Sequence, residues 1–245
     1  MHPSRILHLW ALQLLRQPLL ASQIAFNSYE NVSFVHPHHT SLDSALDSAE
    51  ERFVFIGPEN KDVDIIDSYL NGPRSLSSDR LALLVVADKG DGAYELMLCA
   101  THYLGDGMAL HTFMNDFYTL LGSSATAESF AQQIIAEFPL SAGLPLSLED
   151  RMPVTGNGST LASAVGRAEN ARNDSKLIGG QAFPSSRTKN QRHTVVPTFA
   201  YSAAETKTIL GKCKANGATI AHAMFALCNI AWARRVAREN RADPW

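Results

Sequence analysis

The sequence lacks the features that mark three large classes of protein. No uninterrupted apolar run reaches the roughly 18 residues that a membrane-spanning helix needs. The three cysteines are scattered and form no Cys-x-x-Cys pair, which favours a reduced, cytoplasmic protein. The formal charge is -3 and no basic stripe is present, so nucleic acid is not expected as a partner. We therefore expect a cytoplasmic monomer that binds neither membranes nor nucleic acid.

What is present has the balance of a folded globular chain. Hydrophobic residues make up 45% of the 245 residues and charged residues 18%. The apolar segment from Ile6 to Leu15, preceded by Arg5, fits two interpretations. It resembles a secretory signal, and it also fits an amphipathic first helix that ends near Pro18. We favour the helix.

The hydrophobic spacing predicts an α/β fold with a mixed sheet flanked by helices. Extended segments are predicted at 22–27, 32–36, 53–56, 81–87 and 94–101. Helices are predicted at 5–16, 41–51, 62–70, 110–121, 127–137, near 160–172, at 202–217 and at 219–240.

The most distinctive local pattern is a hairpin between residues 81 and 101. Leu81 to Ala87 is a continuous apolar run, which is typical of a strand buried on both faces. Asp91-Gly92 follows, a favoured pair for a type I′ turn, in which both central residues take a positive φ. Tyr94 to Thr101 then forms the returning strand.

The second half of the sequence is less regular. Residues 139–200 are rich in proline and serine, which predicts a crossing segment or linker. Ser202 and Glu205 form a capping box for the helix that follows. The last helix is apolar nearly all round over 219–233, so we expect it to be buried by elements that follow in a longer protein.

The segment after the second hairpin strand carries the candidate chemistry. By the two-residue period of a strand, His102 shares a face with large apolar side chains, so we expect it to point inward. A neutral imidazole held at the end of a strand is well placed to accept a proton. Asp106 stands at the predicted helix start, and Gly107 leaves space beside the histidine.

Each of these residues also has a structural explanation. A buried histidine is usually a core residue with one hydrogen bond, and Asp106 can simply cap the helix. However, only about 0.03 chance matches to His-x-x-x-Asp-Gly are expected in a chain of this composition. The match also falls at a strand–turn–helix junction, so we favour the catalytic interpretation.

The segment from His102 to Gly107 resembles the active-site motif of the chloramphenicol acetyltransferase-like superfamily. This superfamily includes plant BAHD acyltransferases, condensation domains and fungal acyltransferases of secondary metabolism, and the resemblance is greatest to the fungal enzymes. The order of a first helix, an Asp-Gly hairpin, the motif and an amphipathic helix is similar to one lobe of the two-lobed fold. Residues 199–235 are similar to the passage into the second lobe.

The resemblance implies a reaction and a role for each motif residue. His102 would act as general base, Asp106 would support the loop by pairing with an arginine, and Gly107 would keep the channel open. The reaction would move an acyl group, expected to be acetyl, from acyl-CoA to a hydroxyl or amine of a small molecule. Acyl-CoA is a co-substrate, and no permanently bound cofactor is expected. Two alternatives stay open, a condensation-type domain with a carrier-protein donor and a non-catalytic remnant.

The sequence also departs from the family pattern. The family's second motif, Asp-Phe-Gly-Trp-Gly, is absent, and members usually exceed 400 residues. We therefore expect a chain truncated to the first lobe at 1–138, the linker at 139–200 and the start of the second lobe at 201–245.

Other polar clusters are weaker candidates. His36-Pro37-His38-His39 has no cysteine or paired carboxylate nearby, so we expect an exposed loop and no metal site. Structural roles are favoured for His111, His193 and His222, the last as a core residue. A solvated loop is favoured over coenzyme A binding for Arg187, Lys189 and Arg192.

Overall fold

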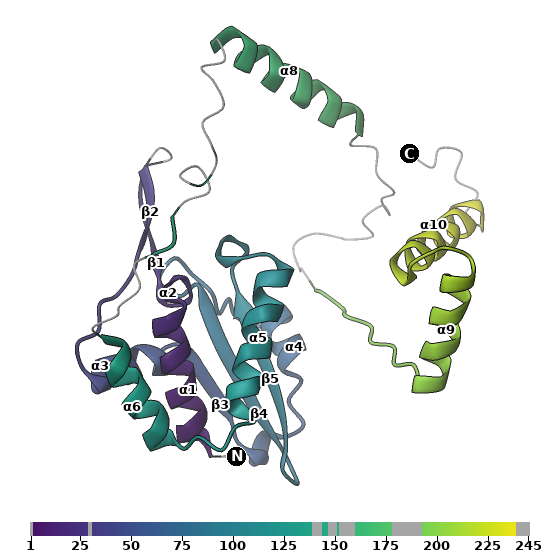
Figure 1. The fold of residues 1–245 in the computed structure, drawn as a ribbon. Coiled ribbons are helices and arrows are strands. Elements are labelled where there is room, and N and C mark those ends of the chain that lie inside the picture. Colours follow the sequence, from purple (N-terminus) through teal and green to yellow (C-terminus); the bar gives the residue numbers. More distant parts are fainter. Residues whose placement is uncertain are drawn as a thin grey trace. The chain divides into compact units, whose positions relative to one another are not determined.

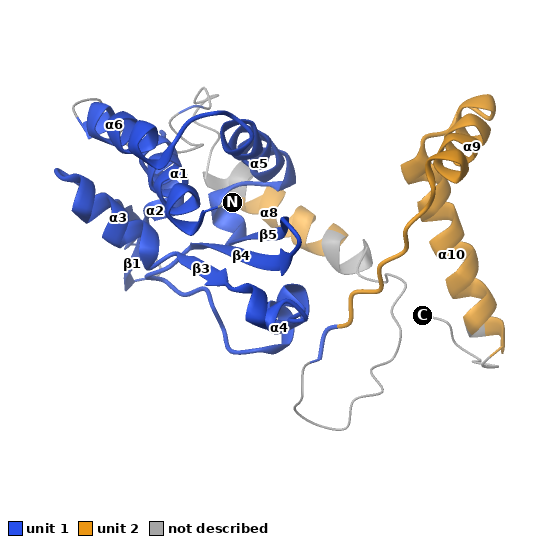
Figure 2. Ribbon diagram, turned by 90° about the horizontal axis from the view of Figure 1, so that it is seen from below, with its two compact units in different colours: residues 1–152, 192–194 blue, residues 153–191, 195–245 orange. Residues whose placement is uncertain are grey.

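The computed structural model describes residues 2–28, 31–138, 144–146, 151, 160–177 and 193–238. The chain divides into two compact units (Figure 2). The first comprises Met1–Met152 with Arg192–Thr194, and the second comprises Pro153–Gln191 with Val195–Trp245. The predicted division at residues 138 and 200 stays a prediction, because most of the linker lies outside the described residues, as do Arg187, Lys189 and Arg192.

The first unit is a mixed α/β structure, as predicted (Figure 1). Its helices are α1 (Pro3–Arg16), α2 (Pro18–Ala21), α3 (Leu42–Glu50), α4 (Ile65–Asn71), α5 (Gly107–Leu121) and α6 (Ala127–Glu137). Its strands are β1 (Gln23–Ser28), β2 (Asn31–Val35), β3 (Phe53–Ile56), β4 (Ala82–Gly90) and β5 (Ala93–Ala100). Short 3-10 turns lie at Pro58–Asn60 and His102–Leu104.

Two sheets form from these strands. β1 and β2 make an antiparallel pair, and β3, β4 and β5 make a mixed sheet in that order. β3 runs parallel to β4, with Phe53 opposite Leu84, whereas β5 runs antiparallel to β4. The predicted turn between β4 and β5 is confirmed, because Asp91 and Gly92 both have positive φ, at 51° and 78°.

Each face of the mixed sheet packs against helices, as predicted. On one face, Leu84 and Val86 join a core with residues of α1, α5 and α6, and the ring of Trp10 meets that of Phe113 edge-on at 6.1 Å. On the other face, Leu83 and Val85 pack with Ile65 of α4. β4 is therefore buried on both sides, which explains its uninterrupted apolar sequence.

The second unit contains α8 (Thr160–Leu177), α9 (Ala203–Ala215) and α10 (Ile220–Arg238). The capping box of Ser202 and Glu205 is confirmed, with both hydrogen bonds present. The last helix is not buried within the described part of this chain, and its expected burial by further elements stays a prediction. Phe225 is 75% exposed and Leu227 is 59% exposed, because α9 is the main element that contacts α10 and covers little of it.

Candidate functional site

His102 lies in the 3-10 turn that joins β5 to α5. The turn begins where Thr101 donates its backbone N–H to the carbonyl of Leu81 at 2.9 Å, just before the start of β4. Leu104 then donates to the carbonyl of Thr101 at 3.1 Å, which closes the turn. The position of residue 102 is thus fixed by backbone hydrogen bonds on either side.

The expected inward orientation of His102 is wrong. Tyr94, Leu96 and Leu98 do face the core beside α1 and α5, as the two-residue period predicts. However, β5 ends at Ala100, and the backbone turns before the alternation reaches residue 102. His102 is therefore exposed. The imidazole is open to solvent in this chain, where a buried general base had been expected.

Asp106 caps α5, as its place at the helix start predicts. Its carboxylate accepts a hydrogen bond from the backbone N–H of Ala109 at 2.9 Å. This bond satisfies one of the free N–H groups at the helix start, and the negative charge suits the helix dipole. Among the described residues, none of the ion pairs includes Asp106, so the expected arginine partner is not seen there.

The two glycines of the motif differ in their surroundings. A Cβ added at Gly107 would meet no atom within 4 Å, so this residue borders open space. A Cβ added at Gly105 would lie 2.9 Å from the Cβ of Ala109. Gly105 therefore allows the turn to approach α5 closely. This role of Gly105 was not predicted from the sequence, because the approach depends on how the turn folds back onto the helix.

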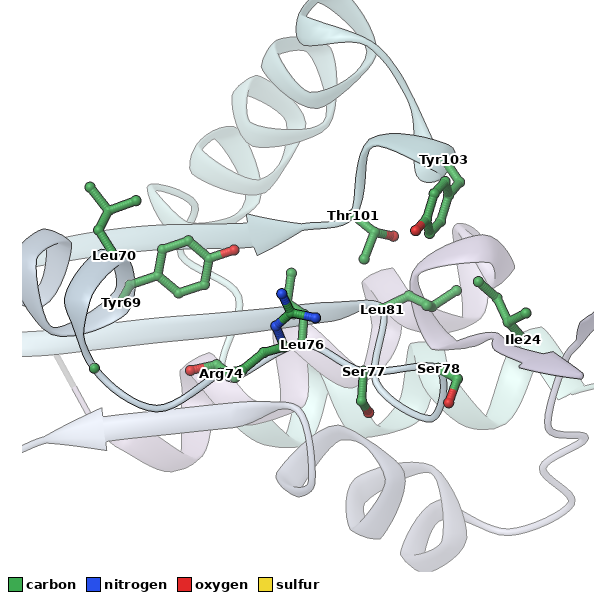
Figure 3. A pocket seen from close by; sticks show the side chains of 12 residues that line it. Ile24, Tyr69, Leu70, Arg74, Leu76, Ser77, Ser78, Leu81, Thr101 and Tyr103 are labelled. Carbon is green, nitrogen blue, oxygen red and sulfur yellow. The ribbon is translucent and has the colours of Figure 1, made fainter. Parts of the chain in front are cut away.

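An open cavity of about 540 Å³ lies beside the motif (Figure 3). Thr101 and Tyr103, the neighbours of His102 in the sequence, form part of its wall, whereas His102 does not. The other polar lining comes from the end of α4 and the loop that follows it, including Tyr69 and Arg74. This loop carries no sequence motif and reaches the cavity only through the tertiary fold, so it was not predicted as part of a site.

The loop beside the cavity is held in place by a second arginine, Arg80. Its Nε donates to the carbonyl of Ser75 at 2.8 Å, and its Nη1 donates to the carbonyl of Glu51 at 3.2 Å. Ser77 and Arg80 also exchange backbone hydrogen bonds. Ser78 accepts a backbone hydrogen bond from Ile24 at 2.7 Å. Hydrogen bonds therefore hold this part of the cavity wall in place.

Burial shifts the pKa of two side chains around this region. Desolvation raises the pKa of Tyr69, and the nearby Cys99 adds to the effect, so the phenol stays protonated as a hydrogen-bond donor. Desolvation also lowers the pKa of the buried Arg52, an effect opposed by Glu51. The Arg52 guanidinium donates to the carbonyls of Ser48, Ala21 and Asp79, and so joins α2, α3 and the loop before β4.

The histidine-rich segment lies elsewhere, beside the end of α1. His36, His38 and His39 border a cavity of about 140 Å³ together with Arg16 and Glu137. Desolvation by burial is the main cause that lowers the pKa of His36 and of His39. Across the described parts of the chain, no group of three or more histidine, cysteine or acidic side chains is arranged to hold a metal ion.

The remaining candidate histidines are exposed. His111 and His193 lie at the surface. The expected core position of His222 is wrong, because this residue is exposed near the start of α10. There it exchanges hydrogen bonds with Thr219, whose N–H donates to its Nδ1 at 3.4 Å. It therefore contributes to capping the helix.

Comparison with known proteins found no protein-family model, curated protein or solved structure that matches this chain. None of the helices within the described residues is long and apolar enough to cross a membrane. The motif and the geometry around it are therefore the features that indicate a function for this chain.

Proposed function

We propose that this chain belongs to an acyltransferase of the chloramphenicol acetyltransferase-like type and forms one lobe of that fold. The observation that carries the proposal is the His-x-x-x-Asp-Gly segment at a strand–turn–helix junction. There His102 is accessible and its backbone position is fixed. The mixed sheet with helices on both faces is compatible with such a lobe.

In the proposed reaction, His102 acts as the general base. Its neutral imidazole takes the proton from a hydroxyl or amine of a small-molecule acceptor while the oxygen or nitrogen attacks the thioester carbonyl of acyl-CoA. The tetrahedral intermediate then collapses, the carbon–sulfur bond breaks, and the imidazolium returns the proton to the departing thiolate. The products are the ester or amide and free coenzyme A, as in acyl transfers of secondary metabolism.

Two neighbours of the histidine support this role. Asp106 holds the first turn of α5 through its bond to Ala109, which fixes the segment that follows the base. Gly107 keeps the space at the helix start free of a side chain. The imidazole is exposed, so a small acceptor and a thioester could approach it from solvent.

A matched pair of histidine variants tests the proposal. The full chain would be incubated with acetyl-CoA and a panel of alcohols and amines, and free coenzyme A and acetylated product would be measured by liquid chromatography with mass spectrometry. We expect His102→Ala to lower turnover by about 10²- to 10⁴-fold, the usual contribution of a general base. His111→Ala should retain turnover, because His111 is an exposed histidine of α5 outside the motif.

Two outcomes would contradict the proposal. Equal turnover by the two variants would remove His102 from the reaction. The absence of turnover in the wild-type chain with acetyl-CoA would favour one of the alternatives. A repeat with acyl groups on a carrier protein would then separate a condensation-type domain from a non-catalytic remnant.

A further inference from the structure

We propose that the cavity beside the motif binds a small carboxylic acid with an apolar body, held by Arg74. The cavity has about 540 Å³ of space, which is within the range of pockets that hold small organic molecules. This binding site is distinct from the proposed base, because His102 does not line it. Its test does not depend on acyl transfer.

The charge in the cavity indicates a ligand with one negative charge. Arg74 is the one charged residue among the described residues of the lining. No ion pair within the described residues involves Arg74. Figure 3 shows its guanidinium reaching into the cavity beside the ring of Tyr69. A guanidinium presents a planar pair of N–H donors that matches the two oxygens of a carboxylate.

Thr101 forms part of the cavity wall on the side of the motif, but its hydroxyl does not face the cavity. Oγ1 of Thr101 is buried and has no hydrogen-bond partner, although buried polar atoms are nearly always paired. Thr101 borders the cavity opposite Arg74, next to Tyr103 (Figure 3). Because this oxygen is inaccessible to solvent, a ligand in the cavity would contact other atoms of the Thr101 side chain.

The rest of the wall favours an apolar body for the ligand. Ile24, Leu76 and Leu81 line the cavity along with Leu70. A phosphate group, with two charges, usually recruits more than one cation or a row of backbone N–H groups. The described lining offers a single cation and aliphatic side chains, which fits a carboxylate on a hydrocarbon or aromatic group.

Hydrogen bonds also hold the loop that carries Arg74 before any ligand binds. Arg80 braces the loop that carries Arg74 through its bonds to Ser75 and Glu51. Asn71, at the end of α4, exchanges two hydrogen bonds with the backbone of Thr194, at 2.7 and 2.9 Å. Because both ends of this loop are held, little ordering cost is expected when a ligand binds.

Calorimetric titration of the full chain tests the proposal. The probes are benzoate, the neutral benzamide and inorganic phosphate at the same ionic strength. We expect benzoate to bind more tightly than either of the others. Arg74→Gln should weaken benzoate binding by about ten- to a hundredfold, as for loss of a charged hydrogen bond.

A control variant separates loss of the Arg74 side chain in the cavity from a general loss of positive charge. Arg167→Gln removes an exposed arginine of α8 that is not part of the lining, and it should leave benzoate affinity unchanged. Circular dichroism of each variant confirms folding, which Arg74→Gln should retain because Arg74 is exposed. Equal affinity for benzoate and benzamide, or an unchanged affinity in Arg74→Gln, would overturn the proposal. Tighter binding of phosphate would overturn the choice of a carboxylate.

Discussion

The contact between the motif turn and α5 gives a prediction that a double-mutant cycle can test. Gly105 has an extended backbone, with φ at 162°, so alanine is not strained there by its backbone angles. The difficulty is the contact, because the new Cβ would lie 2.9 Å from the Cβ of Ala109. Neither atom is at the end of a flexible side chain, so the turn and the helix must move apart.

The expected change in the free energy of unfolding is the balance of two opposing contributions. Forcing an extra methyl group into a closely packed contact costs about 1–3 kcal/mol. Replacing glycine reduces the freedom of the unfolded chain and returns about 0.4–1 kcal/mol. We therefore expect Gly105→Ala to lower the free energy of unfolding by about 0.5–2 kcal/mol. Ala109→Gly alone should cost about 0.5–1 kcal/mol, because glycine disfavours the helix.

The double variant shows whether Gly105→Ala destabilises the protein through the contact with Ala109 or through another cause. In the Ala109→Gly background the opposing methyl group is gone, so Gly105→Ala should be neutral or stabilising. The free energies come from urea unfolding followed by circular dichroism. Gly107→Ala serves as a control and should stay within about 0.5 kcal/mol of wild type, because its Cβ meets nothing. If Gly105→Ala destabilises both backgrounds equally, the reasoning is refuted.

Two further predictions concern burial. Burial raises the pKa of Cys99 to about 11, so its thiol should resist alkylation in the native protein, whereas Cys213 and the exposed Cys228 should react. Mass spectrometry after iodoacetamide treatment checks this, and equal labelling of all three would contradict it. Desolvation lowers the pKa of His36 and His39 in the folded state, so the unfolded chain binds more protons as the pH falls below about 6.5. The free energy of unfolding should therefore fall between pH 7.5 and 5.5, and it should fall less in the double variant His36→Asn/His39→Asn. Urea unfolding at the two pH values measures it, and an equal fall in both proteins would exclude this cause.

The local elements of the fold could be predicted from the sequence because their causes are local. The Asp91-Gly92 turn depends on two adjacent residues that tolerate positive φ. The start of α9 depends on Ser202 and Glu205, three positions apart. The start of α5 depends on Asp106 and the free N–H groups that follow it. In each case the interacting groups are neighbours in the chain.

The orientation of His102 and the exposure of α10 were decided by the tertiary structure. The two-residue alternation places a side chain only while the strand continues, and β5 ends two residues before His102. The apolar sequence of α10 indicates that burial is favourable, but burial also requires a facing surface, and α9 covers little of the helix. Neither the end of a strand nor the presence of a packing partner is contained in a periodic pattern.

The sequence by itself determined where the helices, the hairpin and the motif lie, since short-range backbone and capping preferences set them. Only the tertiary structure brought Arg74 and Tyr69 to the same cavity as Thr101 and Tyr103. It also placed Gly105 against Ala109. These contacts depend on how β5 pairs with β4 and how α4 packs on the sheet. Such pairings are set by the burial of whole faces, which no single segment of the sequence specifies.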